Sequence, residues 1–108
     1  IDLKGFTDQF YAKLGGDLGT VRHFIQRAAE ACHVELTTLI VPGENDSEQE
    51  IKELASWVGG ISSDIPLHIT RFFPRWKMTD RGATDIRTVY SLAETARKSL
   101  KHVFIGNC

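Results

Sequence analysis

The sequence predicts an α/β fold built from parallel βα units. Residues 34–47, VELTTLIVPGENDS, form the clearest unit: an apolar, β-branched run typical of a buried strand, a Pro-Gly turn and a polar loop. Ser47 and Glu50 then have the spacing of a capping box, just before a periodic apolar run. Strand-like segments begin near residues 34, 66 and 102, and intervals of about 30 residues suit one βα unit. Helical crossovers between such strands make the sheet parallel, with right-handed connections.

The first third of the chain predicts a strand end and two helices. Residues 1–4 resemble the last residues of a strand, and Thr7 is expected to cap a short helix that the glycine pair 15–16 ends. From residue 21 the apolar positions follow one stripe of an amphipathic helix, so we expect them to face the core. These positions are Val21, Phe24, Ile25, Ala28 and Cys32.

The rest of the chain alternates strand and helix. A helix over about 48–58 follows the strand 34–41 and ends at the glycine pair 59–60, and a second strand covers 67–73. Thr84 or Asp85 is expected to cap the last helix, and residues 102–105 form a final strand. The inward positions of that helix are Ile86, Val89, Ala93, Ala96 and Leu100.

So few strands cannot close a barrel, which usually needs about eight. We therefore expect residues 1–108 to be a single segment of a larger βα barrel or sheet. Such a segment exposes apolar surface at its unfinished edge, where it can self-associate.

Composition excludes several classes of protein. The formal net charge of −1 argues against a general nucleic-acid binder, because such domains are strongly basic. No apolar run approaches the roughly 20 residues that span a bilayer, so no membrane partner is expected. Two cysteines in a chain of 108 residues are too few for a disulfide framework, which indicates the reducing cytoplasm.

Three polar side chains at or inside strands are candidates for binding a small ligand. Asp2 and Lys4 alternate on one strand end, so both project to the same side and can contact hydroxyl and carboxylate groups; the alternative is a structural ion pair. Thr37 lies inside the central strand beside Thr38, where a threonine can hydrogen-bond a ligand or simply supply β-propensity. In the next loop, Asn45 and Asp46 can contact a ligand or form a turn that caps the helix.

The loop 71–81, RFFPRWKMTDR, is the most unusual stretch of the sequence. Basic and aromatic residues crowd together there, at the edge where α/β proteins bind ligands. They can clamp an anion, bind a partner or stack on nucleobases, or the aromatic residues can close one end of the core. The residues proposed for a substrate or partner are Arg71, Phe72, Arg75, Trp76 and Lys77.

No metal site is predicted. The four histidines, at positions 23, 33, 68 and 102, show no metal-ligand spacing, and none neighbours a cysteine motif. Cys32 lies on an apolar stripe and is expected to be a core residue.

Several short motifs follow one another along the chain in a definite order. They are Asp2-Leu3-Lys4, Phe10-Tyr11, Leu14-Gly15-Gly16, V-P-G-E-N-D-S at 41–47, R-F-F-P-R-W-K-M at 71–78 and G-N at 106–107. This order resembles the second half of a radical SAM protein of the pyruvate formate-lyase activating enzyme type. It is most similar to the AmmeMemoRadiSam system subgroup, and the resemblance covers nearly the whole chain.

The resemblance implies that the chain is the C-terminal half of a partial (β/α) TIM-like barrel. In such enzymes a [4Fe–4S] cluster reductively cleaves S-adenosylmethionine, and the 5′-deoxyadenosyl radical abstracts hydrogen from a substrate or partner protein. Asp2 and Lys4 match the D-x-K motif that helps to hold S-adenosylmethionine. Thr37, which stands where activating enzymes carry an arginine in the central strand, is the third residue that the resemblance implies for binding this molecule. The missing N-terminal half-barrel would be the chain's first partner.

Two departures from the family shape this expectation. The cluster motif C-x-x-x-C-x-x-C is absent, and two cysteines cannot supply three thiolates at that spacing. The glycine-rich strand that holds the methionyl amine in the family is also missing. The chain alone is therefore expected to bind no cluster and to be inactive. The alternative is a free-standing half-barrel module that uses the loop 71–81 to bind a protein or RNA.

Overall fold

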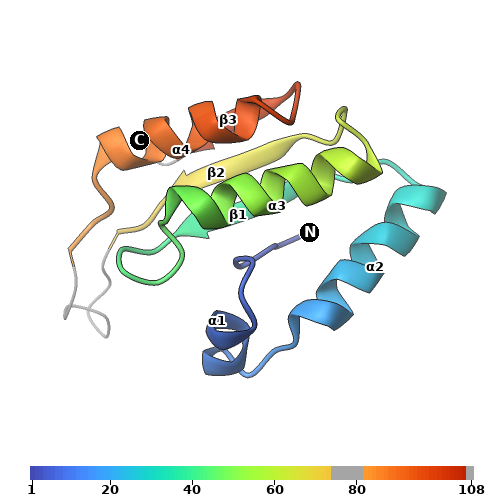
Figure 1. Ribbon diagram of the computed structural model, residues 1–108, viewed down its shortest axis with the longest axis horizontal. Helices are drawn as coiled ribbons and strands as arrows, with labels where there is room; N and C mark the ends of the chain where they lie inside the picture. The colour runs from blue at the N-terminus through green and yellow to red at the C-terminus, as the bar shows by residue number, and fades with distance from the viewer. Residues whose placement is uncertain (74–81, 107–108) are drawn as a thin grey trace.

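The computed structural model describes residues 1–73 and 82–106 of the chain. Strands and helices alternate from α2 onward, which confirms the predicted α/β class (Figure 1). The helices are α1 Asp8–Lys13, α2 Leu18–Ala31, α3 Glu48–Ile61 and α4 Ile86–Arg97. The strands are β1 Leu36–Ile40, β2 Leu67–Arg71 and β3 Val103–Gly106. None of the helices in the described ranges is long and apolar enough to cross a membrane.

The strands form one parallel sheet in the order β1-β2-β3, as the crossovers predict. Leu36 of β1 lies opposite Leu67 of β2, which lies opposite Val103 of β3. The N-terminal segment adds to the other edge of β1 through a parallel bridge between Asp2 and Thr37. The predicted strand end is therefore confirmed, and neighbours along the chain are neighbours in the sheet.

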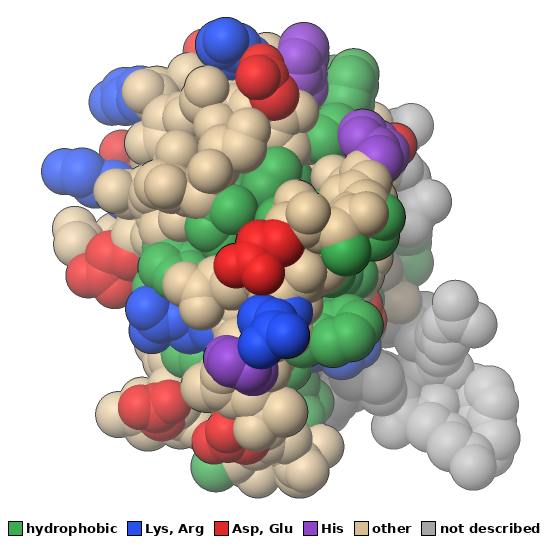
Figure 2. Space-filling view, turned by 90° about the vertical axis from the view of Figure 1, so that its right-hand side faces the viewer, with side chains coloured by type: hydrophobic (Ala, Val, Ile, Leu, Met, Phe, Trp, Pro, Cys, Tyr) green, Lys and Arg blue, Asp and Glu red, His purple; other side chains and the backbone are tan. Residues whose placement is uncertain are grey.

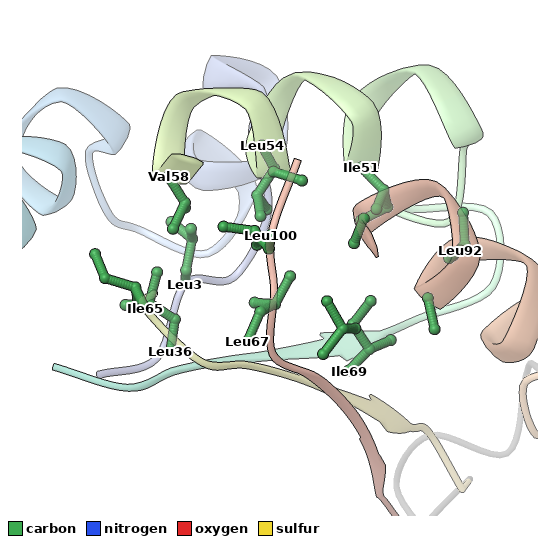
Figure 3. Close-up of a cluster of buried hydrophobic side chains, with 14 of the residues drawn as sticks. Leu3, Leu36, Ile51, Leu54, Val58, Ile65, Leu67, Ile69, Leu92 and Leu100 are labelled. Carbon is green, nitrogen blue, oxygen red and sulfur yellow. The ribbon is translucent and has the colours of Figure 1, made fainter. Parts of the chain in front are cut away.

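The core lies between the sheet and the helices that cover one of its faces. Figure 3 shows the side chains of Leu36, Leu67 and Ile69 pointing from the strands toward Leu54 of α3 and Leu92 of α4. All five are at most 2% exposed. Fully burying a side chain of this size is worth about 1.5–3 kcal/mol, so this contact between the sheet and its helices is a large favourable contribution to folding.

The opposite face of the sheet is left open by the described residues. Along β1, Leu36 and Ile40 are buried, whereas Thr37 is half-buried and Leu39 is 38% exposed. On β3 the exposed fraction of Phe104 reaches 50%. Alternation along a strand sends these two sets of side chains to opposite faces, and only one face has helices over it.

Helix α3 runs past the glycine pair that was expected to end it. The helix continues through Gly59 and Gly60 to Ile61. A Cβ atom on Gly59 would lie 2.8 Å from the backbone oxygen of Ser99, whereas one on Gly60 would meet nothing within 4 Å. Gly59 therefore serves the close approach of α3 to the turn after α4, and the prediction of a helix stop was wrong.

Three residues predicted to face the core are exposed. Phe24 is 58% exposed, because it precedes the fully buried Ile25 by one residue and so lies about 100° round the helix. Ile86, the first residue of α4, is 39% exposed. Cys32 is the C-cap of α2 with φ −157° and ψ 171°, so the extended backbone takes its thiol off the helical stripe and leaves it exposed.

Candidate functional site

Asn45 joins two strand ends at the carboxyl edge of the sheet. It is 1% exposed, and its side-chain oxygen accepts a 2.7 Å hydrogen bond from Val41 N. Its Nδ2 donates to the backbone oxygens of Lys4 at 2.7 Å and Leu39 at 2.8 Å. This side chain is therefore fully occupied within the protein, which favours the structural reading of Asn45 over contact with a ligand.

Thr84 likewise joins the ends of two strands, β1 and β2. Its hydroxyl donates to Ile40 O at 2.5 Å and accepts from Phe72 N at 3.2 Å, while its backbone oxygen accepts a 2.6 Å bond from Arg71 Nε. The neighbouring Asp85, not Thr84, caps α4 by accepting from Arg87 N. The rim of the sheet is thus held by buried polar side chains on loops.

The capping box at α3 is only half formed. Ser47 Oγ accepts from Glu50 N at 3.1 Å, as predicted. The Glu50 carboxylate turns instead to Phe6 N at 2.7 Å, just after the segment that carries Asp2 and Lys4. Burial raises the pKa of Glu50, and the hydrogen bond from Phe6 partly opposes that shift. Glu50 therefore orders the loop that follows the candidate ligand residues.

The three residues predicted to hold S-adenosylmethionine lie together on the open face. Asp2 and Thr37 are bridge partners in adjacent strands, and Lys4 forms a salt bridge with Asp2. The two charged side chains are each about half exposed. Thr38 points the other way, where its hydroxyl donates to Leu3 O at 2.7 Å in the core. Both predictions for Asp2 and Lys4, a structural ion pair and contact with a ligand, are compatible with this geometry, because the carboxylate and the ammonium group are both open to solvent.

A further cluster stands beside Thr37 and was missed from the sequence. The register places His68 opposite Thr37, and Phe104 opposite His68. The His68 ring stacks on Phe104 at 5.2 Å, and its Nε2 lies 2.7 Å from Glu35 Oε1. The only sequence signal was the alternation of Glu35 with Thr37, which puts both on one face. Hydrogen bonds from His68 and then His33 lower the pKa of Glu35.

The basic aromatic loop is described only at its start. Arg71 ends β2, and its guanidinium lies 4.6 Å from the ring centre of Phe73, which is 48% exposed. Phe72 is 4% exposed, so its ring belongs to the interior and offers a partner almost no surface. The predictions for Arg75, Trp76 and Lys77 lie outside the described residues.

The described residues contain no group of three or more His, Cys, Asp or Glu side chains that could hold a metal ion. A cavity of about 700 Å³ opens near the C-terminus of α2, with His23, His33 and Cys32 in its lining. A smaller one of about 460 Å³ has Glu35, His68 and Phe104 in its lining. Figure 2 shows a face on which basic, acidic and histidine side chains are interspersed with apolar patches, without a continuous basic stripe.

No model of a known protein family matches the chain. The chain is similar to an uncharacterized protein of Methanocaldococcus jannaschii. The two are 33% identical over 117 aligned positions, which cover 99% of this chain and 33% of that protein. The chain thus spans about a third of the length of the curated relative that it matches.

Proposed function

We propose that this chain is the C-terminal part of a radical SAM enzyme of the pyruvate formate-lyase activating enzyme type. Its open sheet face would line the inside of a partial (β/α) barrel, and Asp2, Lys4 and Thr37 would help to hold S-adenosylmethionine there. The observation that carries the proposal is the joint placement of these three residues on the face of the sheet without helices.

The topology supports the barrel. The sheet keeps the order of the chain, and the helices that pack on it lie on one side (Figure 1). A doubly wound sheet reverses its strand order and carries helices on both faces, whereas a barrel adds each strand beside the last with its helix outside. In a barrel the open face would be the interior.

Exposed aromatic side chains on the outer helices support additional βα units. The guanidinium of Arg22 on α2 lies 5.1 Å from the ring centre of Trp57 on α3. Phe24 lies on another side of α2 and is 58% exposed. On α4, Thr95 bonds Glu48 of α3, whereas Tyr90 lies away from that contact and is 52% exposed. Both flanks of the helical layer therefore offer apolar surface to a neighbouring helix.

The residues present fit S-adenosylmethionine and do not fit the cluster. A carboxylate, an ammonium group and a hydroxyl can pair with the hydroxyl, amino and carboxylate groups of that molecule. When bound and reduced, S-adenosylmethionine supplies the 5′-deoxyadenosyl radical of this family. The chain has two cysteines in all, fewer than the three thiolates of the family's motif, so no step of the reaction is assigned to iron–sulfur chemistry here.

Isothermal titration of S-adenosylmethionine into the purified chain tests the proposal. We expect weak, saturable binding that is lost in Lys4→Ala, because that ammonium group lies in the proposed site. Lys52→Ala removes an exposed lysine from the helical side and is the matched control. Binding that is absent in the native chain, or unchanged in Lys4→Ala, would contradict the assignment of these residues.

The contact between Arg71 and Phe73 favours a second candidate. An arginine over a half-exposed aromatic ring is a surface that stacks on a base or an aromatic side chain. The chain would then be a free-standing half-barrel that binds a protein or RNA through the loop 71–81. The affinity for single-stranded RNA or peptide, measured with and without Arg75 and Trp76, tests this candidate, and unchanged affinity would remove it.

A further inference from the structure

Glu35 is the negative charge on the open face that is not matched by a lysine or arginine. Its carboxylate contacts two imidazoles, His68 Nε2 at 2.7 Å and His33 Nε2 at 3.1 Å. Within the described residues, the other carboxylates nearby have cationic partners: Asp2 pairs with Lys4, and Asp64 lies 3.3 Å from Lys101. Glu35 therefore offers an incoming cation a carboxylate whose side-chain partners, among the described residues, are two imidazoles, while its backbone oxygen accepts a 2.9 Å hydrogen bond from the Ile1 amino group.

The hydrogen bond to Glu35 determines which ring nitrogen of His68 faces the carboxylate and which one is left for a ligand. Two hydrogen bonds to the Glu35 carboxylate favour its ionised form and lower its pKa. An ionised carboxylate only accepts hydrogen bonds, so His68 carries a proton on Nε2. The other ring nitrogen, Nδ1, makes no hydrogen bond within the described residues, and in the tautomer with the proton on Nε2 it is an acceptor. Glu35 and His68 are thus both acceptors toward an incoming ligand.

An exposed aromatic ring completes the cluster. Phe104 stacks on His68 at 5.2 Å and is 50% exposed. Both side chains line a cavity of about 460 Å³ together with Glu35 and Asp64. An aromatic face next to carboxylates is an environment that attracts a cation, and the cavity is shallow and open, so a ligand there stays partly in solvent.

We propose that this cavity binds the protonated amine of a small molecule, with Glu35 as the ion-pair partner, His68 Nδ1 as a hydrogen-bond acceptor and Phe104 as the aromatic wall. Binding of the amine does not depend on the function proposed above. The further step, that the amine-bearing molecule is the substrate whose hydrogen is abstracted, rests on that function. His68 lies opposite Thr37 in the register, so the two proposed ligands would occupy neighbouring strands of one face.

Titration with putrescine, followed through the NMR signals of the labelled chain, tests the proposal. We expect saturable shifts at Glu35, His68 and Phe104, and none with 1,4-butanediol, which has the same carbon chain without the charges. In Glu35→Gln the affinity should fall about fivefold, the scale of a partly exposed ion pair. In Phe104→Leu it should fall by a smaller factor, while Glu53→Gln on the outer side of α3 should bind as the native chain does.

Equal binding of the diol, unchanged affinity in Glu35→Gln, or no saturable shift with putrescine would overturn the proposal and leave the cluster as a structural ion pair. Phe104→Leu provides a second readout, because it retains Glu35 and His68 and removes only the aromatic ring. The two proposals fail separately: Lys4→Ala should lose S-adenosylmethionine and bind putrescine as the native chain does, whereas Glu35→Gln should keep S-adenosylmethionine and bind putrescine more weakly.

Discussion

The Glu50 carboxylate accepts a 2.7 Å hydrogen bond from the backbone N–H of Phe6, 44 residues away in the sequence. The carboxylate is on the first turn of α3, and Phe6 begins the loop after the strand end with Asp2 and Lys4. A Cβ atom on the intervening Gly5 would lie 2.8 Å from Glu50 Oε2. A helix-capping position therefore controls the path of the chain beside the proposed ligand site.

The stability of the chain should depend on pH through Glu50. Burial raises the pKa of Glu50, so the folded state holds this proton more tightly than the unfolded state does. The contribution of Glu50 is therefore fully present below the unfolded pKa and is lost as the pH rises through the raised folded pKa. In Glu50→Gln, urea unfolding should show a smaller loss of stability between acidic and neutral pH than in the native chain.

The exposed Glu30 on α2 provides the control for this measurement, because it is not among the charges that act on Glu50. Glu30→Gln removes a carboxylate from the surface and should preserve the native pH dependence. If Glu50→Gln and the native chain keep a constant difference in free energy of unfolding over that range, the raised pKa of Glu50 is wrong.

Two adjacent glycines should respond oppositely to the same substitution. Gly59→Ala places a methyl group 2.8 Å from Ser99 O and should destabilise the fold by about 1–3 kcal/mol. Gly60→Ala meets nothing within 4 Å and should stabilise the helix by about 0.5–1 kcal/mol. Denaturant midpoints of the two variants measure the difference, and a gain in both would show that α3 does not approach the turn so closely.

Asn45→Ala should be among the most destabilising polar substitutions. It removes three partly buried hydrogen bonds and leaves Val41 N and two backbone oxygens without that partner, so we expect a loss of about 2–4 kcal/mol. The exposed amide Gln49 offers the comparison, because Gln49→Ala lies nearby on α3 and should cost about 0.5 kcal/mol or less. Thermal or urea unfolding compares the two variants, and similar losses of unfolding free energy would argue against the proposal that Asn45 holds the strand ends together.

The purified chain should self-associate as its concentration rises. Phe24, Tyr90 and Phe104 are each at least 50% exposed, on the two flanks and the open face. Sedimentation velocity should show species larger than a monomer, and a Phe24→Glu, Tyr90→Glu double variant should shift the distribution toward the monomer. A control variant, Gln26→Ala with Glu94→Ala, changes one exposed polar residue on each of the same two helices and should leave the distribution as it is. A chain that stays monomeric at all concentrations would mean that these surfaces are not adhesive.

The sequence was sufficient for the parts of the fold that depend on local signals. The apolar run before Pro42 predicted β1, and the Ser47 cap predicted the start of α3. The alternation in 1–4 placed Asp2 and Lys4 on one side, where the structure has them in contact. These patterns are decided within a few residues, so a single chain reveals them.

Features that depend on distant contacts were beyond such reasoning. Gly59 looked like a helix stop, because nothing local announces that Ser99 approaches it. Cys32 followed the apolar stripe by number, but the backbone leaves the helix there. The partnership of Glu35 with His68 depends on the register of two strands 33 residues apart, which no spacing rule encodes.

The sheet also separates two kinds of evolutionary change. Replacing Thr37 or His68 changes the helix-free face of the sheet without disturbing Leu36 or Ile69, whose side chains leave the same strands in the other direction. Related proteins with this arrangement can therefore vary that face while keeping an unaltered packing layer behind it. Selectivity in such a scaffold can diverge quickly, at little cost to folding.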